Sequence, residues 1–175
     1  MSTVSVRPAV NGDIDQIVEV FLACWRDTYA AALPQRLIAA MTDERARDIW
    51  ARVDQEAAPG ELLVAVAALP ARIVGVTRFG PVIDGTGHIG SLYVSPLAQG
   101  LGVGRTLMEA ATESLARSGG TTATLWVFRD NAPSIAFYRH LGWLPDGSRR
   151  TQAEFGEPET RMWRPITPAA QVGPT

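Results

Sequence analysis

Apolar residues recur at helical spacing in the amino-terminal third of the chain. Behind Asp13, apolar side chains occupy positions 14, 17, 18, 21, 22 and 25, which form one face of a helix. Asp13, with Gln16 three residues later, predicts a capped start for this helix. Two more helical patterns follow, at 35–41 and 43–56. This third of the chain is therefore predicted to be mostly helical.

Runs of β-branched and aromatic residues predict the strands. The first run is 4–7, before Pro8, and the next two, 62–69 and 72–79, are separated by a link of hairpin size. Further strands are predicted at 88–94, at 121–128 and in the closing part of the chain between Trp143 and Arg164. Because short hairpins join the middle strands, we expect an α/β fold with a mixed, mostly antiparallel central sheet flanked by helices. One domain is predicted over 1–165, with a loose tail at 166–175.

The stretch from Leu92 to Leu107 has a local pattern of its own. Leu92-Tyr93-Val94 reads as the end of a strand, because the proline of Ser95-Pro96 cannot pair in a ladder. Gly100, Gly102 and Gly104 then lead into a helix with apolar residues at 103, 107, 110, 111 and 115. The first turn of a helix has free N–H groups, and glycines let an anion approach them. The stretch is therefore predicted to bind phosphate.

Several ligands and roles are compatible with a glycine-rich turn. The chain contains no lysine, which excludes a Walker A loop. The alternating glycines do not match the G-x-G-x-x-G spacing of dinucleotide-binding proteins, and the antiparallel sheet also argues against that fold. A tight turn without a ligand is a further alternative.

Composition and charge narrow the class of partner. The chain has 175 residues, of which 46% are hydrophobic, and a formal net charge of −2. This balance offers no basic field for nucleic acid or a membrane surface. One cysteine, Cys24, and two histidines do not suffice for a disulfide framework or a zinc cluster, so no metal site is predicted. The amino end does not resemble a signal peptide, and a cytoplasmic protein is expected.

Two spaced motifs resemble those of the GNAT superfamily of acetyl-CoA-dependent N-acyltransferases. The phosphate motif Q/R-x-x-G-x-G/A is matched by Gln99, Gly102 and Gly104. A second signature, N-x-x-A-x-x-F-Y-x-x-x-G-F, is matched by Asn131, Phe137, Tyr138 and Gly142, with Ser134 and Trp143 as small departures. The order of elements fits from about Val4 to Arg164.

The resemblance implies a fold and a cosubstrate. The sheet is expected to splay between the strands that end at Val94 and Phe128, with acetyl-CoA in the opening. Backbone N–H groups of 99–105 would hold the pyrophosphate, and the pantetheine arm would pair with Tyr93 and Val94. The predicted cofactor-binding residues are Leu92, Tyr93, Val94, Gln99, Gly100, Leu101, Gly102, Val103, Gly104, Arg105 and Asn131.

The resemblance also implies acetyl transfer to a primary amine. Tyr138 matches the family's general acid, which protonates the departing sulfur, although an aromatic packing role is the alternative. His88 stands where many relatives carry glutamate, and its ordinary pKa suits a general base. A solvent-facing histidine is equally compatible with the sequence, and Asp84 or a water chain are alternative bases.

The acceptor is predicted to be a small molecule or peptide. Candidate residues for the walls of its pocket are Trp25, Tyr29, Arg78 and Phe155, of which Trp25 also fits the core-facing side of the first helix. A non-catalytic acyl-CoA-binding regulatory module is the alternative function, and an NAD-dependent oxidoreductase is a third. Because relatives often pair exposed sheet edges, a homodimer is one arrangement that the resemblance allows.

Overall fold

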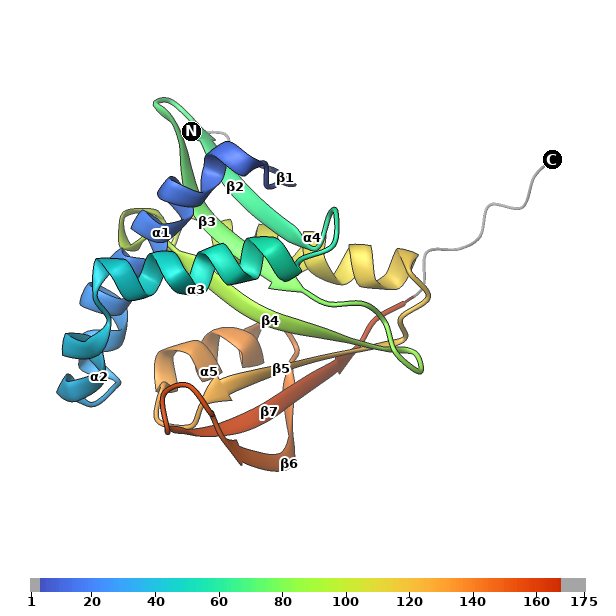
Figure 1. Cartoon of the computed structure of the whole chain (residues 1–175). Coiled ribbons are helices and arrows are strands. Elements are labelled where there is room, and N and C mark those ends of the chain that lie inside the picture. The colour runs from blue at the N-terminus through green and yellow to red at the C-terminus, as the bar shows by residue number, and fades with distance from the viewer. Residues whose placement is uncertain (1–3, 168–175) are drawn as a thin grey trace.

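The computed structural model describes residues 4–167. Seven strands form one sheet in the order β1-β2-β3-β4-β5-β7-β6 (Figure 1). The strands are β1 (Val4–Pro8), β2 (Leu62–Ala68), β3 (Ala71–Phe79), β4 (Thr86–Val94), β5 (Thr122–Phe128), β6 (Leu144–Thr151) and β7 (Pro158–Pro165). Every neighbouring pair is antiparallel except β4 and β5, which are parallel. The predicted mixed, mostly antiparallel sheet is confirmed.

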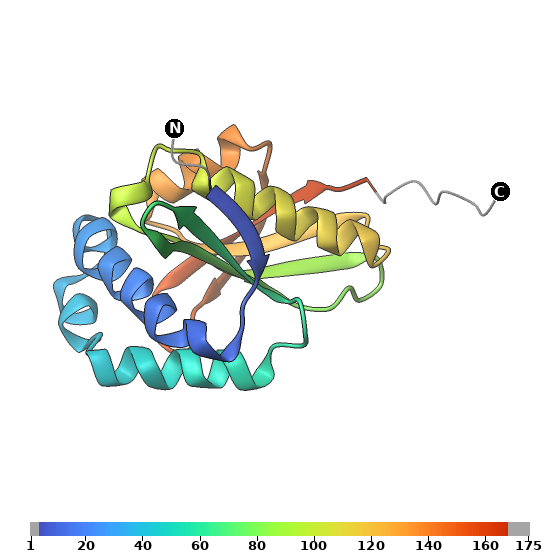
Figure 2. The same ribbon diagram turned by 90° about the horizontal axis from the view of Figure 1, so that it is seen from above.

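Helices cover both faces of the sheet. They are α1 (Ile14–Ala23), α2 (Gln35–Ala40), α3 (Asp43–Glu56), α4 (Val103–Arg117) and α5 (Ala132–His140). Figure 2 shows the sheet between α4 on one side and α1 with α3 on the other. After α1 the chain continues directly as a π-helical turn, Cys24–Thr28, in which Cys24 and Trp25 are buried.

Two apolar clusters result from the alternation of side chains along the strands. On β2, Leu63 and Ala65 face the cluster under α4, while Leu62 and Val64 face the cluster under α1 and α3. At Gly87 on β4, α4 lies so close that a Cβ would stand 2.5 Å from a methyl of Leu115. The sheet is thus buried on both faces where the helices lie.

The parallel pair is the place where the sheet opens. Only Thr86–Ile89 of β4 pairs with Thr122–Leu125 of β5. A bulge at Gly90, opposite the step from Arg78 to Phe79 on β3, turns β4 away from β5. Figure 1 shows the two strands separating toward their carboxyl ends. The expected splay is confirmed, and it leaves one edge of β4 unpaired beyond Ile89 within the described chain.

Two predictions about the ends of elements are revised. Asp13 is the N-cap residue of α1, as predicted, but capping by the Asp13 and Gln16 side chains is wrong, since the Asp13 carboxylate binds Arg7 at 2.6 and 3.0 Å and the Val10 N–H at 2.9 Å. Gln16 instead accepts a hydrogen bond from the Ile73 N–H at 3.0 Å. Ile166, placed in the predicted tail, is buried, and the remaining tail residues 168–175 lie outside the described part of the chain.

Across residues 4–167, the helices are all too short or too polar to cross a membrane.

Candidate active site

A cavity of about 520 Å³, here named the loop cavity, lies between the free edge of β4, the glycine-rich loop, the start of α4 and α5. The residues predicted to bind the cofactor that line it are Leu92, Tyr93, Val94, Gln99, Gly100, Gly102, Val103, Gly104 and Arg105. Residues that lie close together in the sequence therefore form most of one wall of the loop cavity.

The N–H groups predicted to bind an anion come from the start of α4. Gly102 precedes the helix with φ +82°, a backbone conformation that favours glycine. Val103, Gly104 and Arg105 form the first turn, whose N–H groups have no acceptor within the helix. The N–H groups of Gln99 and Leu101, in contrast, contact the carbonyls of Pro96 and Ala98 at 3.4 Å. The free donors are thus fewer than the predicted run 99–105.

Two predicted cofactor residues lie outside the loop cavity. Leu101 is 69% exposed and does not line it. Asn131 is 2% exposed, and its Oδ1 accepts a hydrogen bond from the Ser134 N–H at 3.2 Å, as the cap of α5. Its contribution is therefore to the position of α5.

Part of the β4 backbone that was predicted to pair with the pantetheine arm already accepts hydrogen bonds from side chains of this protein. The Val94 carbonyl accepts from the Cys24 thiol at 3.0 Å and from the Gln99 amide at 3.4 Å. Gln99 also donates to the Thr28 hydroxyl at 2.9 Å. Burial raises the pKa of the Cys24 thiol to about 12, so this group is a neutral donor. Together these bonds tie the turn after α1 to the glycine-rich loop.

A second cavity of about 140 Å³, the fork cavity, occupies the place where β4 and β5 separate. Tyr29, Tyr93 and Tyr138, the three tyrosines of the chain, line both the loop cavity and the fork cavity. Burial raises the pKa of the Tyr138 phenol above its ordinary value, so the group keeps its proton at neutral pH. Tyr138 therefore stands at the junction of the two cavities as a protonated phenol.

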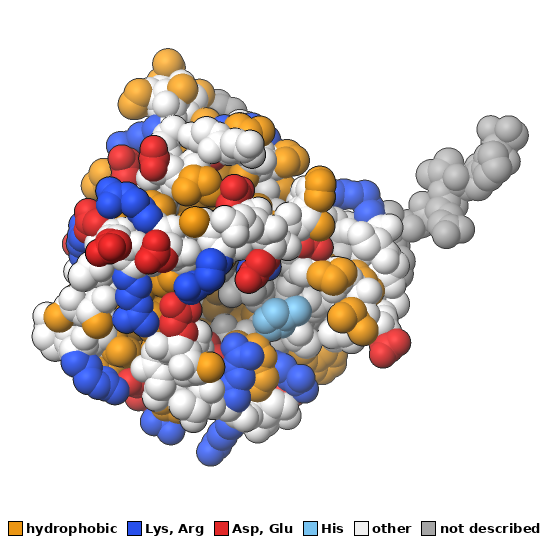
Figure 3. All heavy atoms as spheres, in the orientation of Figure 1, with side chains coloured by type: hydrophobic (Ala, Val, Ile, Leu, Met, Phe, Trp, Pro, Cys, Tyr) orange, Lys and Arg blue, Asp and Glu red, His pale blue; other side chains and the backbone are white. Residues whose placement is uncertain are grey.

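A third cavity of about 370 Å³, the outer cavity, is formed by α3, β3, β4 and the segment between β6 and β7. Figure 3 shows this face hollowed below the charged side chains of α3. The residues that it shares with the fork cavity are His88, Gly90, Ser91, Tyr93, Gln152 and Phe155. The three cavities follow one another in the order loop, fork, outer.

His88 lies where the fork and outer cavities meet. Its Nδ1 is 3.1 Å from the Thr124 hydroxyl on β5. Burial lowers the pKa of His88, and the guanidinium groups of Arg150 and Arg161 lower it further. The imidazole is therefore neutral at neutral pH and able to accept a proton. Asp84, the alternative base, lies in the turn before β4 and lines none of these cavities.

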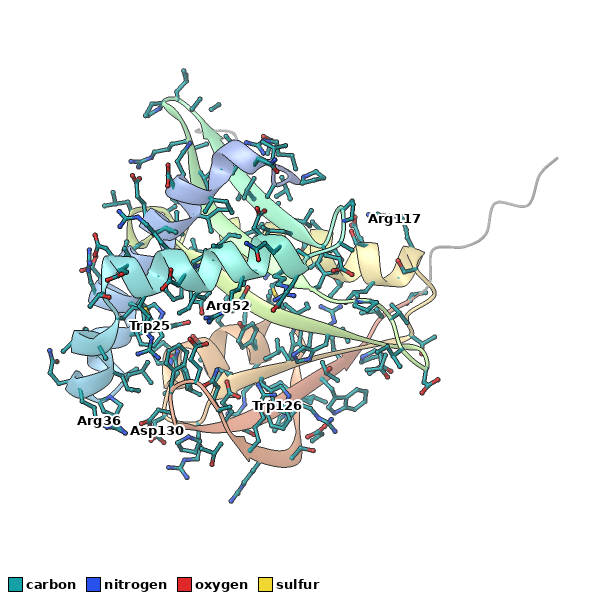
Figure 4. The ribbon with its side chains drawn as sticks, viewed as in Figure 1. Trp25, Arg36, Arg52, Arg117, Trp126 and Asp130 are labelled. Carbon is teal, nitrogen blue, oxygen red and sulfur yellow. The ribbon has the colours of Figure 1, made fainter. Side chains whose placement is uncertain are left out.

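The residues predicted to contact an acceptor are distributed over the cavities. Arg78 and Phe155 line the outer cavity, and Tyr29 lines the loop and fork cavities. Arg78 forms an ion pair with Glu56 at 3.4 Å. Trp25 is 1% exposed and lines none of the three, because its ring packs on Tyr29 and Phe155 with centroids 5.6 and 4.9 Å away (Figure 4). Its role is therefore to support the two rings.

Two arginines of α3 contact Glu154, which lines the outer cavity. Arg52, labelled in Figure 4, lies 3.4 Å from the Glu154 carboxylate, and Arg45 lies 4.0 Å from it. The Arg45 guanidinium also stands 5.3 Å above the Phe155 ring. These contacts connect the segment between β6 and β7 to α3 across the hollow.

Several residues that line the cavities were not predicted as site residues. Cys24 and Thr28 enter the loop cavity from the turn after α1, and Phe137 enters it from α5. Ser91 and Gln152 line both the fork and outer cavities. The family signature marked Phe137, but the other four belong to no local motif.

Within residues 4–167, histidine, cysteine, aspartate and glutamate side chains form no group of three that could hold a metal ion.

Comparisons with known proteins identify the family. Residues 14–143 match the model described as the Acetyltransferase (GNAT) family. The uncharacterized N-acetyltransferase YuaI of Bacillus subtilis (strain 168) is 29% identical over 140 residues, which are 78% of each chain. A mycothiol acetyltransferase of Arthrobacter sp. (strain FB24) is 37% identical over 76 residues, 41% of this chain and 24% of that relative.

Solved structures share the fold over nearly the whole chain. The PaiA N-acetyltransferase of Thermoplasma acidophilum, in complex with coenzyme A, superposes with a TM-score of 0.71 at 19% identity and covers 94% of this chain and 99% of its own. YncA of Salmonella typhimurium, with acetyl-CoA, has a TM-score of 0.65 at 22% identity over 99% of each chain. The family model spans most of the sequence, and the solved structures share the architecture. The chain therefore belongs to the GNAT family of acetyltransferases and is an acyltransferase.

Proposed function

We propose that this protein transfers the acetyl group of acetyl-CoA to a primary amine of a small molecule or peptide, by direct attack of the amine on the thioester. The observation that supports this most is the position of Tyr138, which lines both the loop cavity and the fork cavity. A thioester that reaches this junction from one side would meet an acceptor that arrives from the other.

The loop cavity is proposed to hold acetyl-CoA. The first turn of α4 offers N–H donors and a partial positive charge to the diphosphate. The unpaired edge of β4 from Gly90 to Val94 runs from there toward the fork cavity. The pantetheine arm would lie along this edge, and an N–H between Leu92 and Val94 would polarise the thioester carbonyl.

His88 and Tyr138 are proposed to move the two protons. His88 takes one proton from the attacking ammonium group, directly or through water, so that the neutral nitrogen can form the new C–N bond. When the C–S bond breaks, the Tyr138 phenol donates its proton to the departing thiolate of coenzyme A, and the nitrogen of the new amide gives its second proton to the tyrosinate, directly or through water. The buried phenol and the neutral imidazole start in the protonation states that these steps require.

A non-catalytic acyl-CoA-binding module would hold the cosubstrate without turnover. Incubation with acetyl-CoA and a panel of primary amines separates the two functions, with free thiol and acetylated product as readouts. Cys24 is 3% exposed, so its thiol adds little to the signal. Acceptor-dependent release of coenzyme A supports the enzyme. Binding of acetyl-CoA without product across the panel would favour the module.

A further inference from the structure

His88 and Thr124 are direct neighbours across the parallel strands. They occupy the same register position of β4 and β5, one step before the last pair, Ile89 and Leu125. The two side chains lie on one face of the sheet, with Nδ1 of His88 3.1 Å from Oγ1 of Thr124. The imidazole is thus anchored at the closed end of the fork.

The Thr124 hydroxyl has a second partner. It also lies 3.3 Å from the carbonyl oxygen of Gly87, which can only accept. A hydroxyl carries one proton, so if that proton points to the carbonyl, the oxygen is left as an acceptor for His88. Both contacts are satisfied together only when Nδ1 of the neutral imidazole carries its proton.

We infer that Thr124 is a positioning residue, which holds His88 with its proton on Nδ1 and leaves Nε2 unprotonated as the atom that accepts the proton of the acceptor amine. The inference rests on the proposed function, in which His88 is the base. It assigns the reacting atom and adds a residue from β5 to the proton-transfer site.

The charges around the pair explain why a hydroxyl suits this position. Arg150 and Arg161 raise the cost of an imidazolium at His88. Each is itself paired with a carboxylate, Arg150 with Glu159 and Arg161 with Asp146, both at 2.6 Å. Both guanidinium groups lie over the ring of Trp126, two residues after Thr124 on β5. The Cζ atoms of Arg150 and Arg161 are 4.4 and 5.8 Å from the ring centroid.

A carboxylate in place of Thr124 would stabilise the imidazolium and raise the pKa of His88. The threonine hydroxyl orients the ring without adding a charge. The base therefore stays neutral and ready to accept a proton at neutral pH.

The tautomer can be measured without any substrate. The chain has two histidines, and in ¹⁵N-labelled full-length protein His88→Gln assigns their side-chain signals. His140, on α5, is the internal reference. At a pH where the ring is neutral, we expect the His88 proton on Nδ1 in the wild type. A wild-type ring with its proton on Nε2 would overturn the inference, whatever the activity of the protein.

Two variants of matched size test the role in turnover. Thr124→Val removes the hydroxyl and keeps the shape, whereas Thr124→Ser keeps the hydroxyl. We expect Thr124→Val to lose the Nδ1–H preference and to lower kcat by about 3- to 10-fold, the worth of one hydrogen bond, with the KM for acetyl-CoA unchanged. Thr124→Ser should retain the tautomer and most of the rate. An unchanged tautomer or kcat in Thr124→Val contradicts the positioning role.

Failure of the proposed function has a different signature. A wild-type protein that acetylates no amine refutes the enzyme, but the spectrum of His88 still reports whether Thr124 sets the tautomer.

Discussion

Gly104, in the first turn of α4, lies against the ring of Phe137 on α5. A Cβ at Gly104 would stand 3.0 Å from Cζ and 3.3 Å from Cε2 of that ring, and 3.6 Å from a methyl of Val94. The next residue on α5 is Tyr138, which lines the junction of the loop and fork cavities. The last glycine of the phosphate motif therefore has a packing role, because it lets α5 approach the cavity and bring the phenol with it.

Gly104→Ala should disturb this contact. The added methyl forces the Phe137 ring or α5 to move by a few tenths of an ångström, so we expect a loss of about 1 to 2 kcal/mol in the free energy of unfolding and a lower kcat. Denaturant unfolding and steady-state kinetics measure the two effects. Gly12→Ala is the control, since nothing lies within 4 Å of its added Cβ. Equal stability and rate in both variants would show that α5 does not depend on this approach.

The three tyrosines that line the fork cavity can be compared as general acids by single replacements with phenylalanine. Tyr138→Phe should lower kcat by about 10²- to 10⁴-fold with little change in acetyl-CoA affinity, because only the proton donor is lost. Tyr29→Phe and Tyr93→Phe should have smaller effects on kcat. If Tyr29→Phe or Tyr93→Phe shows the large loss instead, the acid is that residue and the assignment to Tyr138 is wrong.

The pH dependence of kcat/KM should report His88. Burial and two nearby arginines hold the pKa of His88 below its ordinary 6.5, and only the unprotonated ring can act as the base. The value of kcat/KM should therefore be at its plateau above pH 6.5 and fall as the pH drops through the lowered pKa of His88. In His88→Gln this acid limb should disappear, together with most of the rate. A limb that persists in the variant belongs to another group.

The glycine-rich loop and the helix after it could be predicted because their signals are local. Pro96 ends the strand and the glycines precede an amphipathic pattern, and the structure places β4 and α4 accordingly. Short links also predicted that the middle strands β2, β3 and β4 would pair antiparallel, whereas the position of β7 between β5 and β6 was not predicted.

The outer cavity could not be predicted in the same way. Its walls come from α3, β3, β4 and the segment before β7, which lie far apart along the chain, and the bulge at Gly90 that shapes it has no sequence signature. The wrong prediction that the Asp13 side chain caps α1 has a similar cause. Its carboxylate could accept from its own helix or from Arg7, and the sequence does not show that β1 places Arg7 within reach.

Gly102 allows a test of phosphate binding with matched variants. Its φ of +82° is a conformation that asparagine and aspartate tolerate better than most residues, and nothing lies within 4 Å of an added Cβ. Gly102→Asn should therefore fold and bind coenzyme A somewhat more weakly than the wild type. Gly102→Asp has the same shape with a negative charge beside the diphosphate, so we expect its Kd to be at least about tenfold higher than that of Gly102→Asn. Calorimetric titration with coenzyme A measures both, and equal affinities would place the diphosphate elsewhere.

Asp13 offers a test of stability that is independent of the site. Its carboxylate binds the Arg7 guanidinium through both oxygens, and this bond holds the pKa of Asp13 below its ordinary 3.8. The pair therefore stabilises the fold above about pH 4, and this contribution is lost as the pH falls through the lowered pKa. Asp13→Asn keeps the shape and removes the charge.

At pH 7 we expect Asp13→Asn to lower the free energy of unfolding by about 1 kcal/mol, a modest value because the Arg7 side chain is 42% exposed and screened by water. Denaturant unfolding should show the difference from the wild type shrinking between pH 4 and pH 2. Asp15→Asn, at an exposed position on α1, should show no such convergence. If both variants follow the wild type at every pH, the bond between β1 and the start of α1 adds nothing to stability.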